Sequence, residues 1–97
     1  MIKITRTRQS ITIQGHANYA EQGKDIVCAG VSALAQTLIY SLEELTQDKI
    51  DCSIKNGNTI IKFWTLSEQA KLLVESFLLG IESIADAYPD NVTLCKH

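Results

Sequence analysis

The sequence is poor in the features that mark specialised classes of protein. One proline and five glycines in 97 residues leave no linker, and there is no low-complexity tract or internal repeat. The first residues, MIKITRTRQSITIQG, alternate apolar and polar side chains and lack the apolar block of a signal peptide. No apolar run approaches the roughly 18 residues that indicate a membrane span. We therefore expect a cytoplasmic protein with no membrane partner, folded as a single domain over residues 1–97.

A strong excess of charge is also absent. Nine lysines and arginines oppose eleven aspartates and glutamates, which gives a net charge of −2. Broad binding to nucleic acid usually requires a basic face. A solvated strand edge explains the basic cluster of Lys3, Arg6 and Arg8, because charges there also discourage pairing with another strand. We therefore expect no direct nucleic-acid partner.

Cysteine is sparse, and its spacing excludes the common metal sites. Three cysteines in a chain without a secretion signal are typical of free thiols rather than of a disulfide framework. No CxxC or HxxxH spacing occurs, so we predict neither a metal site nor a cofactor. A chain of this length buries roughly 60–70% of its unfolded surface. The modest core and two strongly apolar helical segments favour a homodimer.

Alternation of apolar and polar residues predicts two pairs of strands. The first pair covers residues 2–4 and 11–13, joined by a turn near residues 7–9. The second pair covers residues 50–54 and 60–64. Asn56–Gly57 lies between the two strands of the second pair. It is a strong hairpin signal because both residues tolerate a positive φ.

Two segments have the three-to-four-residue spacing of a helix with one apolar face. They are residues 25–45 and residues 70–85, and the second helix should end before Pro89. The segment TLSE, residues 65–68, fits a capping box in which Thr65 caps the second helix and the glutamate reaches back.

A last short strand at residues 92–94 completes the order ββαββαβ. Two hairpins that each precede a helix are most simply arranged in two layers. The expected fold is therefore an α+β two-layer sandwich, with both helices packed on one face of a mainly antiparallel sheet.

The most reactive side chains gather in GHANYAEQGKDIVCAG, residues 15–30. Cys28 falls in the first turn of the predicted helix, where unpaired N–H groups and the helix dipole favour a thiolate. His16 ends the preceding strand, and the polar loop can fold back to bring its imidazole to the thiol. A histidine there accepts the thiol proton and later protonates a leaving group. The N–H groups at the helix start are candidates to hold a developing oxyanion. These are the parts of a cysteine hydrolase.

Each of these residues also has a structural interpretation, which the spacing leaves open. Cys28 fits a buried structural thiol as well as a nucleophile. Asp25 fits either a helix cap or a third member that orients His16. Ser32 lies one turn after Cys28 on the same side of the helix. It fits either a hydrogen bond near the substrate or a small residue at a tight helix contact.

The same stretch resembles the signature of a known family. GHA, a short polar loop with a glycine, and then DIVCAGVSAL are similar to the motif of the ribosomal-processing cysteine protease family, Prp. The length and the order ββαββαβ agree with that family across the whole chain. The matching residues are Gly15, His16, Ala17, Gly23, Asp25, Ile26, Val27, Cys28, Ala29 and Ser32.

The resemblance implies a cysteine endopeptidase that removes an N-terminal extension from a large-subunit ribosomal protein. It makes Cys28 the nucleophile and His16 its partner in a Cys–His dyad, with Asp25, Ser32 and Gly15 in support. It also implies a homodimer and a mobile loop, residues 17–24, that gates the site. The loop residues that this assignment singles out are Ala17, Asn18, Tyr19 and Gly23.

Other functions fit the same residues. Similar proteases trim phage capsid or scaffold proteins, and Asn18 stands where an acidic residue is common in the family. A non-catalytic, ribosome-associated binding protein would keep the fold and leave Cys28 inert. A thiol redox protein would need Cys52 to approach Cys28 through folding.

Overall fold

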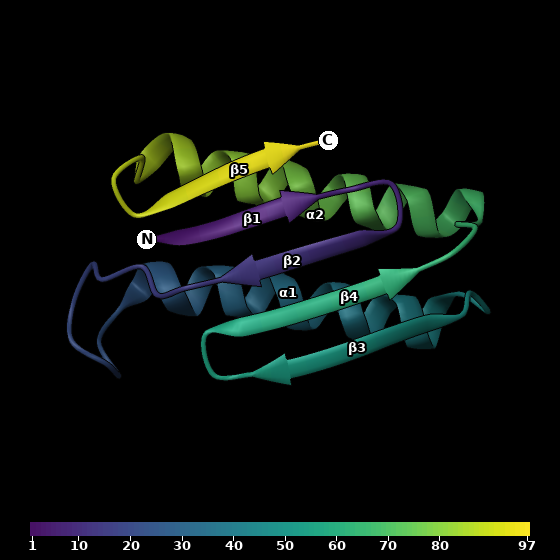
Figure 1. The fold of residues 1–97 in the computed structure, drawn as a ribbon, viewed down its shortest axis with the longest axis horizontal. Helices are drawn as coiled ribbons and strands as arrows, with labels where there is room; N and C mark the ends of the chain where they lie inside the picture. Colours follow the sequence, from purple (N-terminus) through teal and green to yellow (C-terminus); the bar gives the residue numbers. More distant parts are fainter.

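The computed structural model covers residues 1–97 and contains two helices and five strands. They follow the order ββαββαβ that the sequence predicts (Figure 1). The elements are β1 (Ile2–Arg6), β2 (Ser10–Gln14), α1 (Ile26–Leu45), β3 (Ile50–Lys55), β4 (Asn58–Phe63), α2 (Glu68–Ala87) and β5 (Val92–Lys96).

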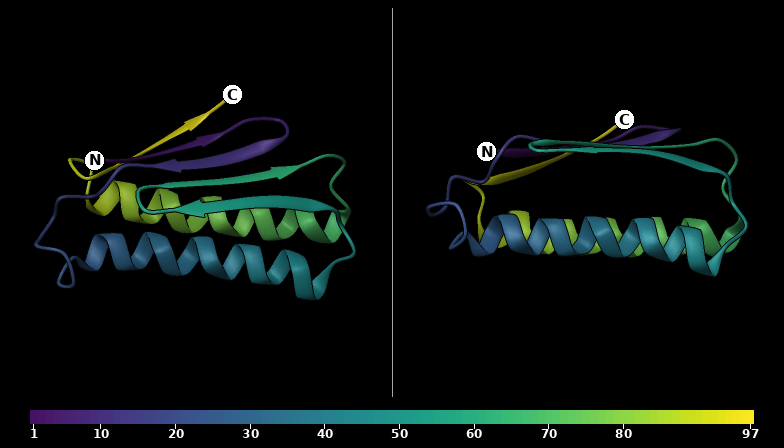
Figure 2. Two further views of the ribbon diagram at one scale, coloured as in Figure 1. Left: turned by 60° about the horizontal axis from the view of Figure 1, so that its bottom comes forward. Right: turned by 90° about the horizontal axis from the view of Figure 1, so that it is seen from below.

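The strands form one sheet in the order β3-β4-β2-β1-β5. All neighbouring strands are antiparallel except β1 and β5, which are parallel. Both helices lie on the same face of the sheet, and the opposite face is uncovered (Figure 2). The predicted α+β two-layer arrangement, with a mainly antiparallel sheet, is confirmed.

The core lies between the sheet and the helices, and all of its buried side chains are apolar. Alternate strand residues point toward the helices, because side chains alternate across a strand. Ile4, Ile11 and Ile61 are completely buried in this way. Val31 and Leu42 of α1 meet this layer from the helical side.

Helix α1 is long and apolar enough, by length and composition, to cross a membrane. No unbroken apolar run of that length occurs in the sequence, but the few polar residues of α1 carry little charge, so the helix passes on average composition. In the fold, however, its apolar side packs into the core through Val27, Val31, Leu38 and Leu42. The core helix of a soluble protein passes the same test, so the composition is weak evidence for a membrane span.

The start of α2 corrects the predicted capping box. Ser67, and not Thr65, is the N-cap, because its hydroxyl accepts a hydrogen bond from the Ala70 N–H at 3.1 Å. Glu68 is the first helical residue and forms a surface ion pair one turn further on. The Ser67 N–H donates to the Asp48 carboxylate at 2.7 Å, so this residue is anchored on both sides.

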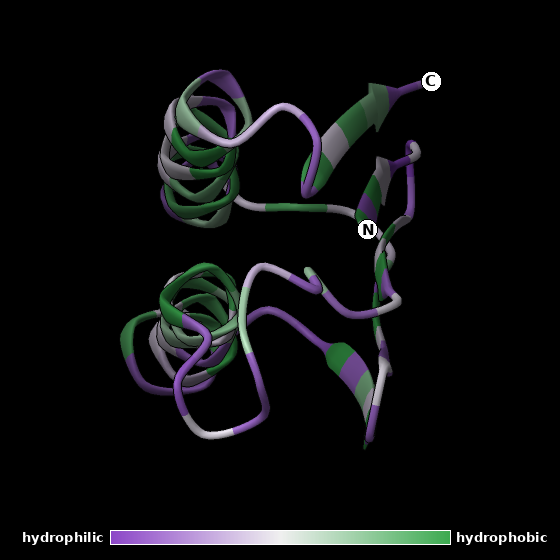
Figure 3. Ribbon diagram, turned by 90° about the vertical axis from the view of Figure 1, so that its left-hand side faces the viewer, coloured by the Kyte–Doolittle hydropathy of each residue, from purple (hydrophilic) through white to green (hydrophobic).

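The end of β2, the start of α1 and the β3–β4 turn meet at one end of the molecule (Figures 1 and 3). The predicted turn at Asn56–Gly57 is confirmed, with Gly57 at a φ of 75° that glycine adopts readily. The Gly57 carbonyl accepts a hydrogen bond from the Gly15 N–H at 2.9 Å, which ties β2 to the turn. Helix α2 also ends here, before Pro89 as predicted.

Candidate active site

The Asp25 side chain joins the start of α1 to the loop that precedes it. One carboxylate oxygen accepts hydrogen bonds from the N–H groups of Val27, at 3.0 Å, and Cys28, at 2.9 Å. The other accepts from the N–H groups of Tyr19, at 3.0 Å, and Ala20, at 3.3 Å. These bonds, the one from Cys28 first, lower the pKa of Asp25. Asp25 is therefore the N-cap of α1, which is one of its two predicted roles.

Cys28 is the third residue of α1 and is half-buried. Its sulfur accepts a hydrogen bond from the Ala17 N–H at 3.3 Å. The backbone N–H groups of Val27 and Cys28 already donate to the Asp25 cap. The expectation that N–H groups at the helix start hold an oxyanion therefore fails for these two. The N–H group that points at the sulfur comes instead from Ala17, in the loop after β2.

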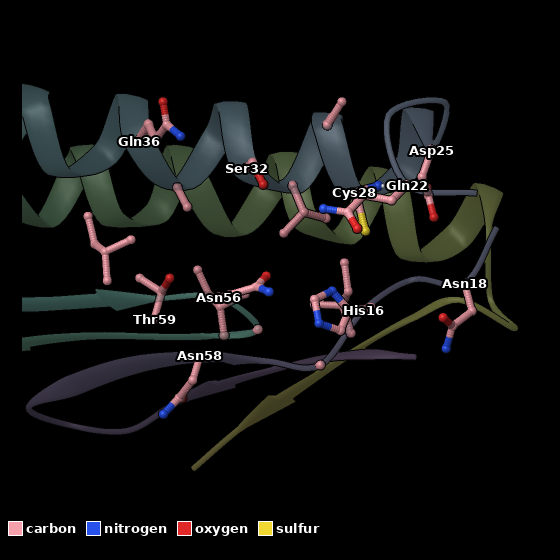
Figure 4. Close-up of a pocket in the computed structure, with 18 of the residues that line it drawn as sticks. His16, Asn18, Gln22, Asp25, Cys28, Ser32, Gln36, Asn56, Asn58 and Thr59 are labelled. Carbon is pink, nitrogen blue, oxygen red and sulfur yellow. Dashed lines mark hydrogen bonds between the residues drawn. The ribbon is translucent and has the colours of Figure 1, made fainter. Parts of the chain in front are cut away.

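His16 is the second residue after β2, beyond Gly15, and it is exposed at the mouth of the same region. Its imidazole packs over the β3–β4 turn, where a Cβ added at Gly57 would lie 2.9 Å from Nε2. Glycine at this turn therefore leaves room for the ring. No hydrogen bond joins His16 to Cys28 or to Asp25 in this state. The Cys28 thiol is carried by the helical layer, and the His16 imidazole is carried by the chain that leaves the sheet (Figure 4).

A cleft of about 850 Å³ runs between α1 and the β3–β4 hairpin. It extends along α1 from Cys28 past Ser32 to Ile39, which is about 16 Å at the helical rise. That length matches about five residues of extended chain. Its far wall includes Ile54, an apolar side chain that is 64% exposed. The predicted site residues that line the cleft are Gly15, His16, Asn18, Gly23, Asp25, Cys28 and Ser32.

Two residues within two positions of His16, Gly15 and Asn18, have positive φ values. Gly15 has a φ of 94°, and a Cβ there would lie 2.3 Å from the Met1 carbonyl oxygen, so only glycine fits. Asn18 has a φ of 55°, which asparagine tolerates better than most residues. The motif glycine before the histidine is thus explained by a close approach of the backbone.

Two predicted loop residues do not line the cleft, because they anchor the loop. Ala17 is buried in the core, and its carbonyl accepts a hydrogen bond from Asn91 Nδ2 at 2.9 Å. Tyr19 packs edge-on against Tyr88, with ring centroids 5.2 Å apart. Asn91 and Tyr88 were not predicted as partners of this loop from the sequence. Neither belongs to a recognisable motif, and each is far from the loop in the chain.

The other two cysteines lie outside the cleft. Cys52 belongs to β3 and is partly buried, and burial raises the pKa of its thiol. Cys95 belongs to β5, at the opposite edge of the sheet. All three cysteines are free, as predicted. No group of three or more His, Cys, Asp or Glu side chains is arranged to hold a metal ion.

Comparison with known proteins finds one family across most of the chain. The family model described as cysteine protease Prp matches residues 1–93. The ribosomal processing cysteine protease Prp of Staphylococcus aureus is 31% identical over 87 residues, which cover 87% of this chain and 82% of that protein.

Two crystal structures of Prp from S. aureus share the fold over their full length and over all of this chain. The first holds a covalently linked product peptide and has a TM-score of 0.95 at 26% identity. The second holds a substrate peptide and has a TM-score of 0.83 at 25% identity.

Proposed function

This chain belongs to the cysteine protease Prp family, and from that premise we propose that it is an endopeptidase that removes an N-terminal extension from a large-subunit ribosomal protein. The observation that carries the proposal is the placement of Cys28. Its sulfur lies in the first turn of α1, faces a cleft and has His16 on the opposite wall. Ribosomal processing is the named role of the S. aureus relative.

The proposed mechanism uses Cys28 and His16 as a dyad. His16 accepts the thiol proton, and the sulfur attacks the scissile carbonyl carbon to form an S–C bond. The C–N bond then breaks, and the imidazolium gives its proton to the leaving amine. Water hydrolyses the thioester and restores the thiol. Since no hydrogen bond joins the two side chains in this state, the imidazole moves toward the sulfur when substrate enters.

The cleft fits an extended peptide on one side of the scissile bond. Its length matches about five extended residues, and its wall offers Ile54 and Ile39 to apolar side chains and Gln36 to polar groups. The two S. aureus structures bind a substrate peptide and a product peptide. We place the peptide of this chain in the cleft, with its scissile carbonyl at Cys28.

Supporting roles follow from the contacts. Asp25 holds the helix start and the loop together, so its proposed role is to position Cys28 rather than to orient His16. Ser32 faces the cleft one turn beyond Cys28 and is placed to hydrogen-bond the peptide backbone. Gly15 permits the turn into His16. Asn18 and Gly23 belong to the gating part of the loop.

We also propose that residues 1–97 form one catalytic domain, that the protein is cytoplasmic and that it forms a homodimer. The small core and the large apolar side chains left exposed on both helices, such as Tyr40, Leu72 and Leu79, support the dimer. Sedimentation at micromolar concentration is expected to show a species of twice 10.7 kDa. A single species at 10.7 kDa would refute the dimer.

A cleavage assay tests the proposed function. Purified protein is incubated with synthetic peptides that carry the N-terminal extensions of large-subunit ribosomal proteins, and products are read by mass spectrometry. A second set carries the N-terminal segments of phage capsid and scaffold proteins. We expect one cut within a ribosomal extension and none in scrambled controls. Cleavage of the phage set alone would overturn the ribosomal assignment, and cleavage of neither set would refute the activity.

A further inference from the structure

Three backbone N–H groups near Cys28, those of Ala17, Val27 and Cys28, are candidates to stabilise the oxyanion of the proposed reaction. Attack on a peptide carbonyl places a negative charge on its oxygen, and fixed N–H donors about 2.7–3.1 Å from that oxygen stabilise the transition state. The Val27 and Cys28 N–H groups are occupied by the Asp25 cap. The Ala17 N–H, in contrast, donates to the sulfur itself at 3.3 Å.

An N–H that points at the attacking sulfur is close to where the oxyanion forms. The oxygen is bonded to the carbon that the sulfur attacks, so only two bonds separate it from Sγ. Once the S–C bond has formed, the sulfur is bonded to two carbons like a thioether, which is a weak acceptor. The Ala17 N–H therefore loses little when it exchanges the sulfur for a charged oxygen, and hydrogen bonds to charged groups are stronger.

Asn91 keeps this part of the chain in place. Its side-chain amide donates to the Ala17 carbonyl at 2.9 Å. Only the nitrogen of that amide is a donor, so the carbonyl fixes its orientation. The Asn91 backbone is fixed in turn, since its N–H donates to the Tyr88 carbonyl at 3.0 Å and its carbonyl accepts from the Ile2 N–H at 2.8 Å. The Ala17 carbonyl and the Ala17 N–H belong to successive peptides, and Ala17, which joins them, is only 1% exposed, so the held carbonyl leaves the N–H little room to rotate.

We propose that the backbone N–H of Ala17 is an oxyanion-hole donor, and that Asn91 is the positioning residue that holds it toward Cys28. The inference rests on the proposed function, because it concerns the same reaction. As the S–C bond forms, the π electron pair of the carbonyl moves to oxygen, and the Ala17 N–H stabilises that charge. When the C–N bond breaks, the pair returns to the C=O bond and the donor is released.

Steady-state kinetics with a peptide that the wild type cleaves test the proposal. Asn91→Ala removes the amide, and Asn91→Asp keeps its shape but replaces the donor by a carboxylate, in case the first variant fails to fold. Ser67→Ala is the matched control, since it removes a helix cap at the far end of α2. Gln22→Ala tests another polar side chain that lines the cleft. The aldehyde analogue of the peptide is a second probe, because its hemithioacetal oxygen occupies the oxyanion position.

We expect both Asn91 variants to lower kcat about tenfold or more with little change in KM, because the interaction exists only in the transition state. Inhibition by the aldehyde should weaken by a similar factor. Ser67→Ala should lower the melting temperature and leave kcat unchanged. If the wild type cleaves and folded Asn91 variants keep its kcat, this inference alone is refuted. A loss of kcat in Gln22→Ala but not in Asn91→Ala also overturns it. A wild type that cleaves no peptide refutes the proposed function, and this inference falls with it.

Discussion

The two helices of this protein begin with the same local arrangement. Asp25 caps α1 and accepts a hydrogen bond from the N–H of Cys28, the third helical residue, at 2.9 Å. Ser67 caps α2 and accepts one from the N–H of Ala70, also the third helical residue, at 3.1 Å. Each cap satisfies backbone donors that the helix itself leaves unpaired. As helix starts, the two are equivalent.

The surroundings of the third residue differ. Ala70 is completely buried in the core. Cys28 is half-buried, faces a cleft and receives the Ala17 N–H on its sulfur. The comparison shows that a capped helix start is a structural device that any helix uses. The proposed chemistry depends on the thiol, the cleft and the chain that leaves β2 with His16.

The carboxylates that bind the two helix starts, Asp25 and Asp48, also show that the local structure of a helix start does not by itself indicate catalysis. Hydrogen bonds from the N–H groups of Cys28, Ala20, Tyr19 and Val27 lower the pKa of Asp25. Hydrogen bonds from Ser67 lower the pKa of Asp48, which contacts the start of α2 and lies outside the cleft. A carboxylate with a depressed pKa at a helix start is therefore no sign of catalysis in this fold.

Moving the thiol from one helix start to the other should have the largest effect. The double variant Cys28→Ala/Ala70→Cys keeps a thiol at the third position of a capped helix. We expect kcat to fall by about 10⁴-fold or more, because the new thiol is buried and lies at the end of the molecule opposite to His16. Kinetics with the cleaved peptide measure this loss. The single variant Ala70→Cys should keep wild-type turnover, and activity in the double variant would contradict the account.

Removing the imidazole should have the next largest effect. His16→Ala takes away the base for the thiol and the acid for the leaving amine. A loss of about 10²–10⁴ in kcat is expected. Because the site is open to solvent, added imidazole should restore part of the activity. His97→Ala, at the other histidine, is the control and should behave as wild type. Wild-type turnover in His16→Ala would remove the histidine from the mechanism.

Neutralising the cap of α1 should have a small effect. Asparagine caps helices about as well as aspartate, so Asp25→Asn should keep its melting temperature and lose only a few-fold in kcat. Asp25→Ala removes the hydrogen bonds to both the helix and the loop, and it should lower both the melting temperature and kcat. Melting curves and kinetics on the two variants provide the test. A large loss of kcat in Asp25→Asn at an unchanged melting temperature would make Asp25 a third catalytic residue beside Cys28 and His16.

Acid should weaken both helix starts. The folded-state pKa values of Asp25 and Asp48 are depressed. Their contribution is therefore present above the unfolded value of about 3.9 and is lost as the pH falls through the folded values. Melting temperatures followed below about pH 5 should fall less steeply in Asp25→Asn/Asp48→Asn than in the wild type. Equal slopes of melting temperature against pH in the two proteins would show that these carboxylates do not stabilise the fold.

Most of the fold could be predicted from the sequence, because local patterns determine it. Alternation over short segments and helical spacing over long ones placed all seven elements. The hairpin at Asn56–Gly57 and the end of α2 before Pro89 were also predictable, because these residues restrict the backbone directly. The cap of α2 was not, since Ser67 is selected over Thr65 partly by a bond to Asp48, which the sequence pattern does not reveal.

The site could be predicted only in outline. The motif brings Cys28, Asp25 and His16 to one end of the molecule, where the structure places them. The occupied N–H groups at the start of α1 and the contact between Asn91 and Ala17 depend on tertiary packing. Asn91 lies beyond α2 in the chain, and it reaches Ala17 only because β5 pairs with β1.

The most direct test of the central claim is cleavage of an extension peptide by the Cys28→Ser protein, followed by mass spectrometry. Serine has nearly the same volume, but its hydroxyl ionises far less readily than a thiol. We expect a folded variant that binds the peptide and leaves it intact, while the wild type cuts one bond. In acid-quenched samples, any acyl adduct on the wild type should map to Cys28 and not to Cys52 or Cys95. Full cleavage by a correctly folded Cys28→Ser protein, free of contaminating protease, would contradict the account.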